Sequence, residues 1–245
     1  GIVLFRTEFL FMNRADAPDE EEQFLAYKSV AQAMKKAPVI IRTLDLGADK
    51  QANLSNIETA NTTLGLRAVR LCLTEPHIFH TQFRALLRAS HYGNIKILIP
   101  MLTSLAELRQ TKLLLAHAKQ SLAKEKIPFN DHIQLGGMIE VPAAAINAKA
   151  FARELDFLSI GTNDLTQYTL AVDRTDSTVA HLYNTLHPSV LQLIANTIAA
   201  GAKFGKAVSV CGEMAGDAQL TKLLLGMGLR QFSMHPSQIL SVKQK

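Results

Sequence analysis

The sequence predicts an α/β fold in which a parallel sheet is covered by helices. Short apolar runs of strand length alternate with longer segments of helical periodicity along the 245 residues. The runs are apolar almost throughout, which is typical of parallel strands buried on both faces. Polar or reactive side chains also follow directly after the strands. In a helix-covered parallel barrel all these positions lie on one rim, where ligands bind.

The strands are expected at seven short β-type runs. The first, at 1–5, leads into Arg6, and the second is expected at 39–41. The fifth, at 156–160, is ended by Gly161 and followed by a polar cluster. The remaining strands are expected at 95–101, 134–139, 207–210 and 230–234.

The helices are expected between these strands, and several carry end signals. Four successive acidic residues open a helix at 19–36, which suits the positive end of the helix dipole. Pro76 divides the helical pattern of 64–90 into two helices, because proline interrupts the hydrogen bonding of a helix interior. Pro142 suits the first turn of a helix at 143–155. Further helices are expected at 104–126, at 188–204 and through 223–225.

The number of strands leaves two architectures open from the residue pattern. A closed (β/α)8 barrel needs eight strands, so either one unit lies outside this chain or the sheet is open and doubly wound. The chain begins at Gly1 inside a strand without an initiator methionine, so we expect it to be part of a longer protein. Its length and its 48% hydrophobic residues are sufficient for one barrel or two small domains.

Composition argues against several classes of function. No apolar run approaches the roughly 18 residues of a membrane span, so no membrane insertion is expected. The net charge of +5 comes without a basic block, so nucleic acid is not an expected partner. Cys72 and Cys211 lie far apart in apolar surroundings, which favours free thiols and a reducing, cytoplasmic compartment. The histidines form no motif with zinc spacing.

Glu140 and Asp164 follow neighbouring strands, one β/α unit apart. Oxygen ligands offered in this way suit Mg²⁺, which keeps waters and recruits substrate oxygens to complete an octahedron. Two other interpretations stay open, since the pair could accept hydrogen bonds from backbone or arginine, or act as general acid and base. Asn163 and Asp164 could also cap the next helix. The repetition of polar residues after other strands favours a ligand site.

Arginines predict an anion site on the same rim. A guanidinium group binds phosphate or carboxylate through bidentate contacts that lysine cannot copy. Arg84 and Arg88 lie on an outer helix face and are interpreted as solvated or salt-bridged. Those placed near the rim are Arg6, Arg42, Arg67 and Arg174.

Cys211 ends a β-branched strand and precedes Gly212, which gives room for close approach. A thiol in this position is a nucleophile, a proton donor or a small buried hydrophobe. The position at the rim favours a functional thiol. Cys72, within a helix, is interpreted as a buried hydrophobe.

Several long motifs, taken in order, resemble one known family over essentially the whole chain. They are RTEFLFM at 6–12, RTLD at 42–45, GMIEVPAA at 137–144, SIGTNDLTQY at 159–168, AVDR at 171–174 and CGE at 211–213. Together they resemble the C-terminal phosphoenolpyruvate-binding domain of enzyme I of the bacterial sugar phosphotransferase system. Alternatives are a domain like that of phosphoenolpyruvate synthase or pyruvate phosphate dikinase, a non-catalytic module that senses phosphoenolpyruvate, and a Mg²⁺-dependent lyase barrel.

The resemblance implies a (β/α)8 TIM-type barrel. It also implies binding of phosphoenolpyruvate and Mg²⁺, with transfer of the phosphoryl group to a histidine and release of pyruvate. By motif match, Glu140 and Asp164 would hold Mg²⁺, and Cys211 would protonate the enolate of pyruvate. The substrate phosphate and carboxylate would be held by Arg6, Arg42, Arg67, Asn163 and Arg174.

The resemblance further implies partners and extent. The full-length enzyme would act on the phosphocarrier protein HPr through an N-terminal domain that this chain lacks, in the cytoplasm and as a homodimer. Residues 1–245 would form one phosphoenolpyruvate-binding domain without the first β/α unit of the barrel and its closing C-terminal helices.

Two local departures from the family pattern lie near one loop. The family's Asn-Pro is missing before the Leu-Gly-x-Arg motif that carries Arg67, and the loop at 51–63 is slightly shorter. Gly47 is followed by Ala48 where the family often has a second glycine, which would alter the approach of Lys50. Arg67 is therefore carried over less directly than the other site residues.

Overall fold

The computed structural model describes residues 1–12, 14, 16–46 and 63–245, except for the side chain of Val3. The chain forms two compact units. The first comprises Gly1–Met101 with Leu105–Leu135, and the second comprises Leu102–Ser104 with Gly136–Lys245. Both units are built from parallel strands that alternate with helices, as the sequence predicts.

The described part of the first unit is built on three parallel strands, β1 (Ile2–Arg6), β2 (Val39–Arg42) and β3 (Ile95–Ile99). Ile41 of β2 is level with Phe5 on one side and with Ile97 on the other, so β2 lies in the middle. All residues of β2 are buried, as expected for a strand of branched residues covered by helices.

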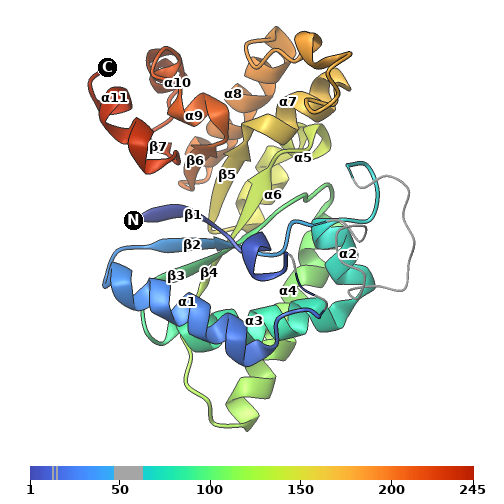
Figure 1. Ribbon diagram of the computed structural model, residues 1–245, viewed down its shortest axis with the longest axis vertical. Helices are drawn as coiled ribbons and strands as arrows, with labels where there is room; N and C mark the ends of the chain where they lie inside the picture. Colours follow the sequence, from blue (N-terminus) through green and yellow to red (C-terminus); the bar gives the residue numbers. More distant parts are fainter. Residues whose placement is uncertain (13, 15, 47–62) are drawn as a thin grey trace. The chain divides into compact units, whose positions relative to one another are not determined.

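The helices of the first unit begin and end close to the predicted positions. Asp19 caps the first helix, where its side chain accepts a hydrogen bond from the backbone N–H of Glu22 at 2.8 Å. The division at Pro76 is confirmed. The helices are η1 (Glu8–Leu10), α1 (Glu20–Met34), α2 (Ala68–Thr74), α3 (Pro76–Ser90) and α4 (Leu105–Lys124). Helix α3 packs between α1 and α4 (Figure 1).

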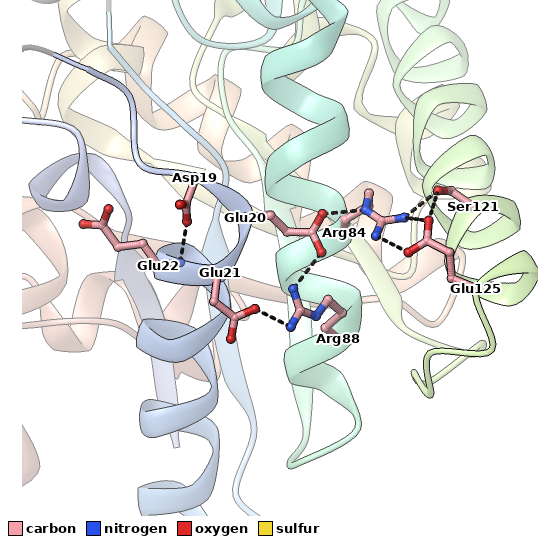
Figure 2. Close-up of polar contacts among 8 residues, drawn as sticks. All are labelled: Asp19, Glu20, Glu21, Glu22, Arg84, Arg88, Ser121 and Glu125. Atoms are coloured by element: carbon pink, nitrogen blue, oxygen red, sulfur yellow. Dashed lines mark hydrogen bonds and ion pairs between the residues drawn. The ribbon is translucent and has the colours of Figure 1, made fainter.

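Two arginines of α3 connect these helices through ion pairs (Figure 2). Arg84 bonds Glu20 of α1 and makes two parallel hydrogen bonds of 2.8 Å to Glu125, just beyond the end of α4. Arg88 bonds Glu20 at 2.7 Å and Glu21 at 2.6 Å. The salt-bridged interpretation of both arginines is confirmed, and Arg84 is buried by its partners rather than solvated.

The second unit is built on four parallel strands, β4 (Gln134–Ile139), β5 (Phe157–Gly161), β6 (Ala207–Cys211) and β7 (Gln231–Phe232). Ile160 of β5 is level with Ile139 of β4 and with Val210 of β6, so the carboxyl ends of these three strands lie at one level. The last strand is shorter than the run predicted at 230–234.

The helices of the second unit differ from the prediction in two ways, since short helices without a predicted counterpart, among them α9 and α11, are also present. The helix expected at 143–155 is two helices that meet at Asn147, although Pro142 begins the first of them as predicted. Helix α8 packs against α5, α6, β5 and β6 (Figure 1). The helices are α5 (Pro142–Ile146), α6 (Ala148–Glu154), α7 (Thr162–Leu170), η3 (Ala180–Leu182), α8 (Pro188–Lys203), α9 (Glu213–Gly216), α10 (Thr221–Gly226), η4 (Pro236–Gln238) and α11 (Ile239–Lys243).

Within the described ranges, no helix combines the length and apolar character that a membrane crossing requires. Both cysteines are free and buried. Burial raises the pKa of the Cys72 thiol, and the nearby negative charge of Asp45 adds to this effect. The interpretation of Cys72 as a buried hydrophobe therefore agrees with its surroundings.

Candidate functional site

Glu140 directly follows β4 and is buried, with 1% of its surface exposed. Because Ile139 pairs with Ile160, Glu140 lies at the level of Gly161, the last residue of β5. A Cβ atom at Gly161 would come within 2.6 Å of Glu140 Oε2 and 2.9 Å of Glu140 Cβ. The carboxylate of Glu140 therefore occupies space that exists only because residue 161 is glycine.

Asn163 and Asp164 lie in the first turn of α7, which begins directly after β5. No side chain caps this helix in the described part of the chain, so the capping interpretation is not supported. Asn163 Oδ1 instead accepts a hydrogen bond from the backbone N–H of Glu213 at 3.0 Å. Since an amide carries its acceptor and its donors on different atoms, this bond directs the Asn163 NH₂ group away from Glu213. Half-buried Asp164 places negative charge where the helix dipole stabilises it.

Cys211 ends β6 opposite Gly161 and is 4% exposed. Its thiol donates to the carbonyl of Ile160, with an S–O distance of 3.4 Å. Ser159 Oγ donates to Cys211 Sγ at 3.8 Å. The hydroxyl of Thr162 donates to the Cys211 carbonyl at 2.9 Å. Main chain and thiol of Cys211 are thus both held by β5 and the start of α7.

Gly212 connects this thiol to α9 in a conformation that suits glycine. Its φ is +93°, and a Cβ atom there would meet Thr162 Oγ1 at 2.5 Å and Asn163 Oδ1 at 2.7 Å. The predicted room for close approach at Gly212 is therefore present, and the Asn163 amide fills part of it.

Arg174 follows α7 and is exposed. Its backbone N–H donates to Gln167 Oε1 at 3.1 Å, which fixes the chain at this point. Tyr183 lies nearby and its hydroxyl donates to the Asn163 carbonyl at 3.2 Å. Partial burial raises the pKa of Tyr183, although contacts with Thr166 and Arg174 oppose the shift. The sequence carried no signal for Tyr183, because it lies outside the recognised motifs.

In the first unit, the predicted arginines gather around Asp45. Arg42 Nη1 lies 2.9 Å from one carboxylate oxygen of Asp45, and Arg67 Nη2 lies 2.7 Å from the other. Arg42 also pairs with Glu8 at 3.1 Å. Burial opposes the ionisation of Asp45, but the charges of Arg42 and Arg67, helped by Arg6, lower its pKa overall. The cluster therefore holds the guanidinium groups of Arg42 and Arg67 in fixed positions near the ends of β1 and β2, where the carboxylates of Asp45 and Glu8 balance their charge.

Buried hydrogen bonds hold the segment that carries Arg42 and Asp45. Thr7 Oγ1 donates to the Arg42 carbonyl at 3.0 Å. Gln82 Oε1 accepts from the Leu44 N–H at 2.9 Å, while its amide nitrogen donates to the Tyr27 hydroxyl. Sequence reasoning missed these supports, because Gln82 lies in a helix far along the chain from the motif that it positions.

The predicted site residues divide between the two units. Arg6, Arg42 and Arg67 belong to the first, and Glu140, Asn163, Asp164, Arg174 and Cys211 to the second. Residues 47–62, which include Gly47, Ala48, Lys50 and most of the predicted loop at 51–63, lie outside the described residues.

The donor set around β4 and β5 fits a magnesium ion. Among the described residues, no three His, Cys, Asp or Glu side chains converge as a complete metal site would require. Glu140 and Asp164 would supply two carboxylates, with waters and substrate oxygens as the other ligands, which is how Mg²⁺ is commonly held. The glycine-lined space that accepts the Glu140 carboxylate is consistent with a role that needs this side chain in one position.

Comparison with known proteins places the chain in a family. Residues 1–245 match the family model of the PEP-utilising enzyme, PEP-binding domain. The chain belongs to this family.

Curated relatives named phosphoenolpyruvate-protein phosphotransferase are similar along the whole chain. The protein of Cupriavidus necator is 55% identical over 249 residues, which cover 100% of this chain and 42% of the relative. The protein of Staphylococcus aureus is 50% identical over 246 residues, which cover 100% of this chain and 43% of the relative. The chain therefore spans less than half the length of these relatives.

Solved structures at low sequence identity share the fold. A malate synthase of Haloferax volcanii in complex with magnesium and glyoxylate has a TM-score of 0.60 at 13% identity, covering 91% of this chain and 59% of the other. A citrate lyase from Burkholderia xenovorans has a TM-score of 0.53 at 16% identity, and the match covers 91% of this chain and 62% of the lyase chain. Likeness at this level shows the fold alone, and it confirms the predicted α/β fold of the TIM-barrel type.

Proposed function

We propose that this chain binds phosphoenolpyruvate together with Mg²⁺. Within the whole protein, the phosphoryl group passes to a protein histidine and pyruvate is released, as the first step of a sugar phosphotransferase system. The observation that carries the proposal is the match of the entire chain to a PEP-binding family, with 55% identity to a relative named phosphoenolpyruvate-protein phosphotransferase. These names favour the phosphotransferase over the dikinase, sensor and lyase alternatives.

Glu140 and Asp164 hold the metal in this proposal, and the buried position of Glu140 beside Gly161 supports it. When bound, Mg²⁺ supplies positive charge for the transferring phosphoryl group and for the enolate oxygen.

The substrate's phosphate and carboxylate are held by arginines and one amide. The guanidinium groups of Arg42 and Arg67 are held in position by their shared partner Asp45. They therefore need little reorientation when an anion binds. The NH₂ group of Asn163 donates to an anionic oxygen, since its carbonyl oxygen is engaged by Glu213. The remaining anion-binding residues are Arg6 and Arg174.

Cys211 supplies the proton that completes pyruvate. When the bond between phosphorus and the enol oxygen breaks, the phosphoryl group goes to the histidine and an enolate remains. The S–H bond of Cys211 then breaks and a C–H bond forms at the methylene carbon, while the electron pair stays on sulfur and solvent later returns a proton. The Ile160 carbonyl, which accepts a hydrogen bond from the thiol, favours the protonated acid that this step needs.

The remaining features of the proposal follow the family resemblance. The protein works in the cytoplasm as a homodimer, and the phosphorylated histidine of its N-terminal domain hands the phosphoryl group to the phosphocarrier protein HPr. Sedimentation of the whole protein tests the dimer, and phosphorylation of added HPr tests the partner.

Calorimetric titration of phosphoenolpyruvate, with and without Mg²⁺, tests the metal assignment. We expect Mg²⁺-dependent binding that weakens by about 100-fold in Glu140→Gln or Asp164→Asn, since even changes around metal ligands cost about 10- to 100-fold. Asp217→Asn is the control, because this exposed carboxylate accepts one backbone hydrogen bond that an amide oxygen also accepts. Unchanged affinity in both carboxylate variants would remove Mg²⁺ from the proposal.

Cys211→Ser is expected to separate binding from proton transfer. Its affinity for phosphoenolpyruvate should stay close to wild type, because the arginines and the carboxylates are untouched. Incorporation of deuterium from D₂O into the methyl group of pyruvate should fall by about 100-fold or more, the usual contribution of a general acid. NMR of pyruvate measures this exchange without a phosphoryl acceptor, and exchange at the wild-type rate would exclude Cys211 as the proton donor.

A further inference from the structure

Ser159 carries a buried hydroxyl group that has no role in the chemistry proposed above. It lies in the middle of β5 and is 1% exposed. A buried hydroxyl is costly unless it is hydrogen-bonded, so its partner indicates why the residue is tolerated in a core strand. That partner is Cys211 Sγ, to which Ser159 Oγ donates at 3.8 Å.

Two hydrogen bonds described for the Cys211 sulfur have opposite effects on its protonation. The Ile160 carbonyl accepts from the thiol at 3.4 Å, and only the S–H form can make this bond. The Ser159 hydroxyl donates to sulfur, and a negatively charged sulfur accepts such a bond more strongly than a neutral one. The first contact therefore favours the acid before proton transfer, and the second favours the thiolate that remains afterwards.

We propose that Ser159 is a positioning residue that holds the Cys211 sulfur and stabilises the thiolate formed when Cys211 gives up its proton. The inference rests on the proposed function for its catalytic meaning, but the coupling between the two side chains is testable without substrate. In the transfer step the S–H electron pair stays on sulfur, toward which the Ser159 hydroxyl already donates, so no further reactant is required.

The strand pairing offers a matched control. Ser209 of β6 is level with Ser159 and is also buried, at 2% exposed. Its hydroxyl donates to the Leu158 carbonyl at 3.5 Å rather than to sulfur. Removing either hydroxyl therefore makes a similar change in the core, and only one of the two changes touches Cys211.

The first measurement is the pH dependence of Cys211 alkylation by iodoacetamide in the folded chain. Mass spectrometry distinguishes alkylation of Cys211 from alkylation of Cys72, because Cys72, residue 159 and Cys211 lie in three different tryptic peptides. In Ser159→Ala the midpoint of alkylation should move up by about one pH unit, since a hydrogen bond to a charged group is worth about tenfold in an equilibrium. In Ser209→Ala the midpoint should stay at the wild-type value. Equal midpoints in Ser159→Ala and wild type, or equal shifts in both alanine variants, would overturn the proposal.

Ser159→Cys keeps the shape of the side chain with a somewhat larger atom and replaces the hydroxyl with a weaker donor, so it covers the case in which Ser159→Ala fails to fold. Its midpoint should move in the same direction by a smaller amount, and a wild-type midpoint would also overturn the proposal.

Deuterium incorporation into pyruvate then tests the catalytic meaning. Ser159→Ala should slow this exchange by about tenfold, as expected for loss of one hydrogen bond to a charged group, without changing the affinity for phosphoenolpyruvate. Ser159→Ala could shift the alkylation midpoint while the wild-type chain exchanges no pyruvate protons. This result would support the coupling between Ser159 and Cys211 and contradict the proposed function. Exchange at the wild-type rate in Ser159→Ala would contradict the catalytic role of Ser159 alone.

Discussion

Gly161→Ala should lower the affinity for phosphoenolpyruvate in Mg²⁺ by about 100-fold, the upper range for disturbed support of a metal ligand. The added methyl carbon would lie 2.6 Å from Glu140 Oε2 and 2.9 Å from Glu140 Cβ, well inside contact distance. The carboxylate end can swing away, but the Cβ of Glu140 is tied to the backbone after β4. We therefore expect Glu140 to leave its present position rather than absorb the clash. Titration calorimetry measures the effect.

Gly226→Ala is the matched control for this substitution. Gly226 is the last residue of α10 in the same unit, and nothing lies within 4 Å of a Cβ atom placed there. Alanine at this position should leave binding unchanged and stabilise the helix by at most about 1 kcal/mol. Wild-type affinity in a folded Gly161→Ala chain would show that the position of Glu140 does not matter for the ligand. An equal loss in Gly226→Ala would show that the effect is not local.

Asp45→Asn should lower the free energy of unfolding by about 3–5 kcal/mol, the usual cost of breaking a buried ion pair by removing one partner. Asp45 is the common partner of Arg42 and Arg67, and its side chain is only 3% exposed. The amide would leave both guanidinium groups without that charge and would turn an NH₂ group toward one of them. Urea denaturation of wild type and variant measures the difference.

The difference between wild type and Asp45→Asn should depend on pH in one direction. Because the arginines lower the pKa of Asp45 in the folded protein, its stabilisation is present above the pKa of the unfolded chain, about 4. That stabilisation is lost as the pH falls through the lower folded value, since the carboxyl group is then protonated in both states. The two chains should therefore differ fully at neutral pH and converge in acid.

Asp131→Asn is the control for Asp45→Asn. The Asp131 side chain is 72% exposed and pairs with Lys119 at 3.4 Å, so its loss should change stability by no more than about 0.5 kcal/mol. A constant difference between Asp45→Asn and wild type at all pH values would mean that packing, rather than charge, makes Asp45 important.

Much of the fold was predictable because its signals are local. The apolar run at 156–160 and the glycine after it predicted β5 (Phe157–Gly161) within one residue. Pro76 and Pro142 predicted the first residues of α3 and α5, because proline is favoured there by its fixed φ. The break at Asn147 was not predictable, since no proline or glycine marks it.

For the candidate site, the sequence predicted which residue types follow the strands, but it did not predict which residues contact one another. The sequence placed Arg42 after a strand, and the motif resemblance assigned it to an anion. Its partners Glu8 and Asp45 come from the ends of two strands whose pairing brings them together, and sequence spacing does not state that pairing.

The amino-acid sequence by itself determined the order of the elements, the family, and the residue types that follow each strand, because apolar runs and motifs lie within short stretches of chain. Only the tertiary structure decided which of these residues touch. Glu140 fills the space beside Gly161, and Ser159 bonds Cys211, through the register of three parallel strands. Register depends on backbone hydrogen bonds between segments roughly 20 to 50 residues apart, so contacts across it arise only when the sheet forms.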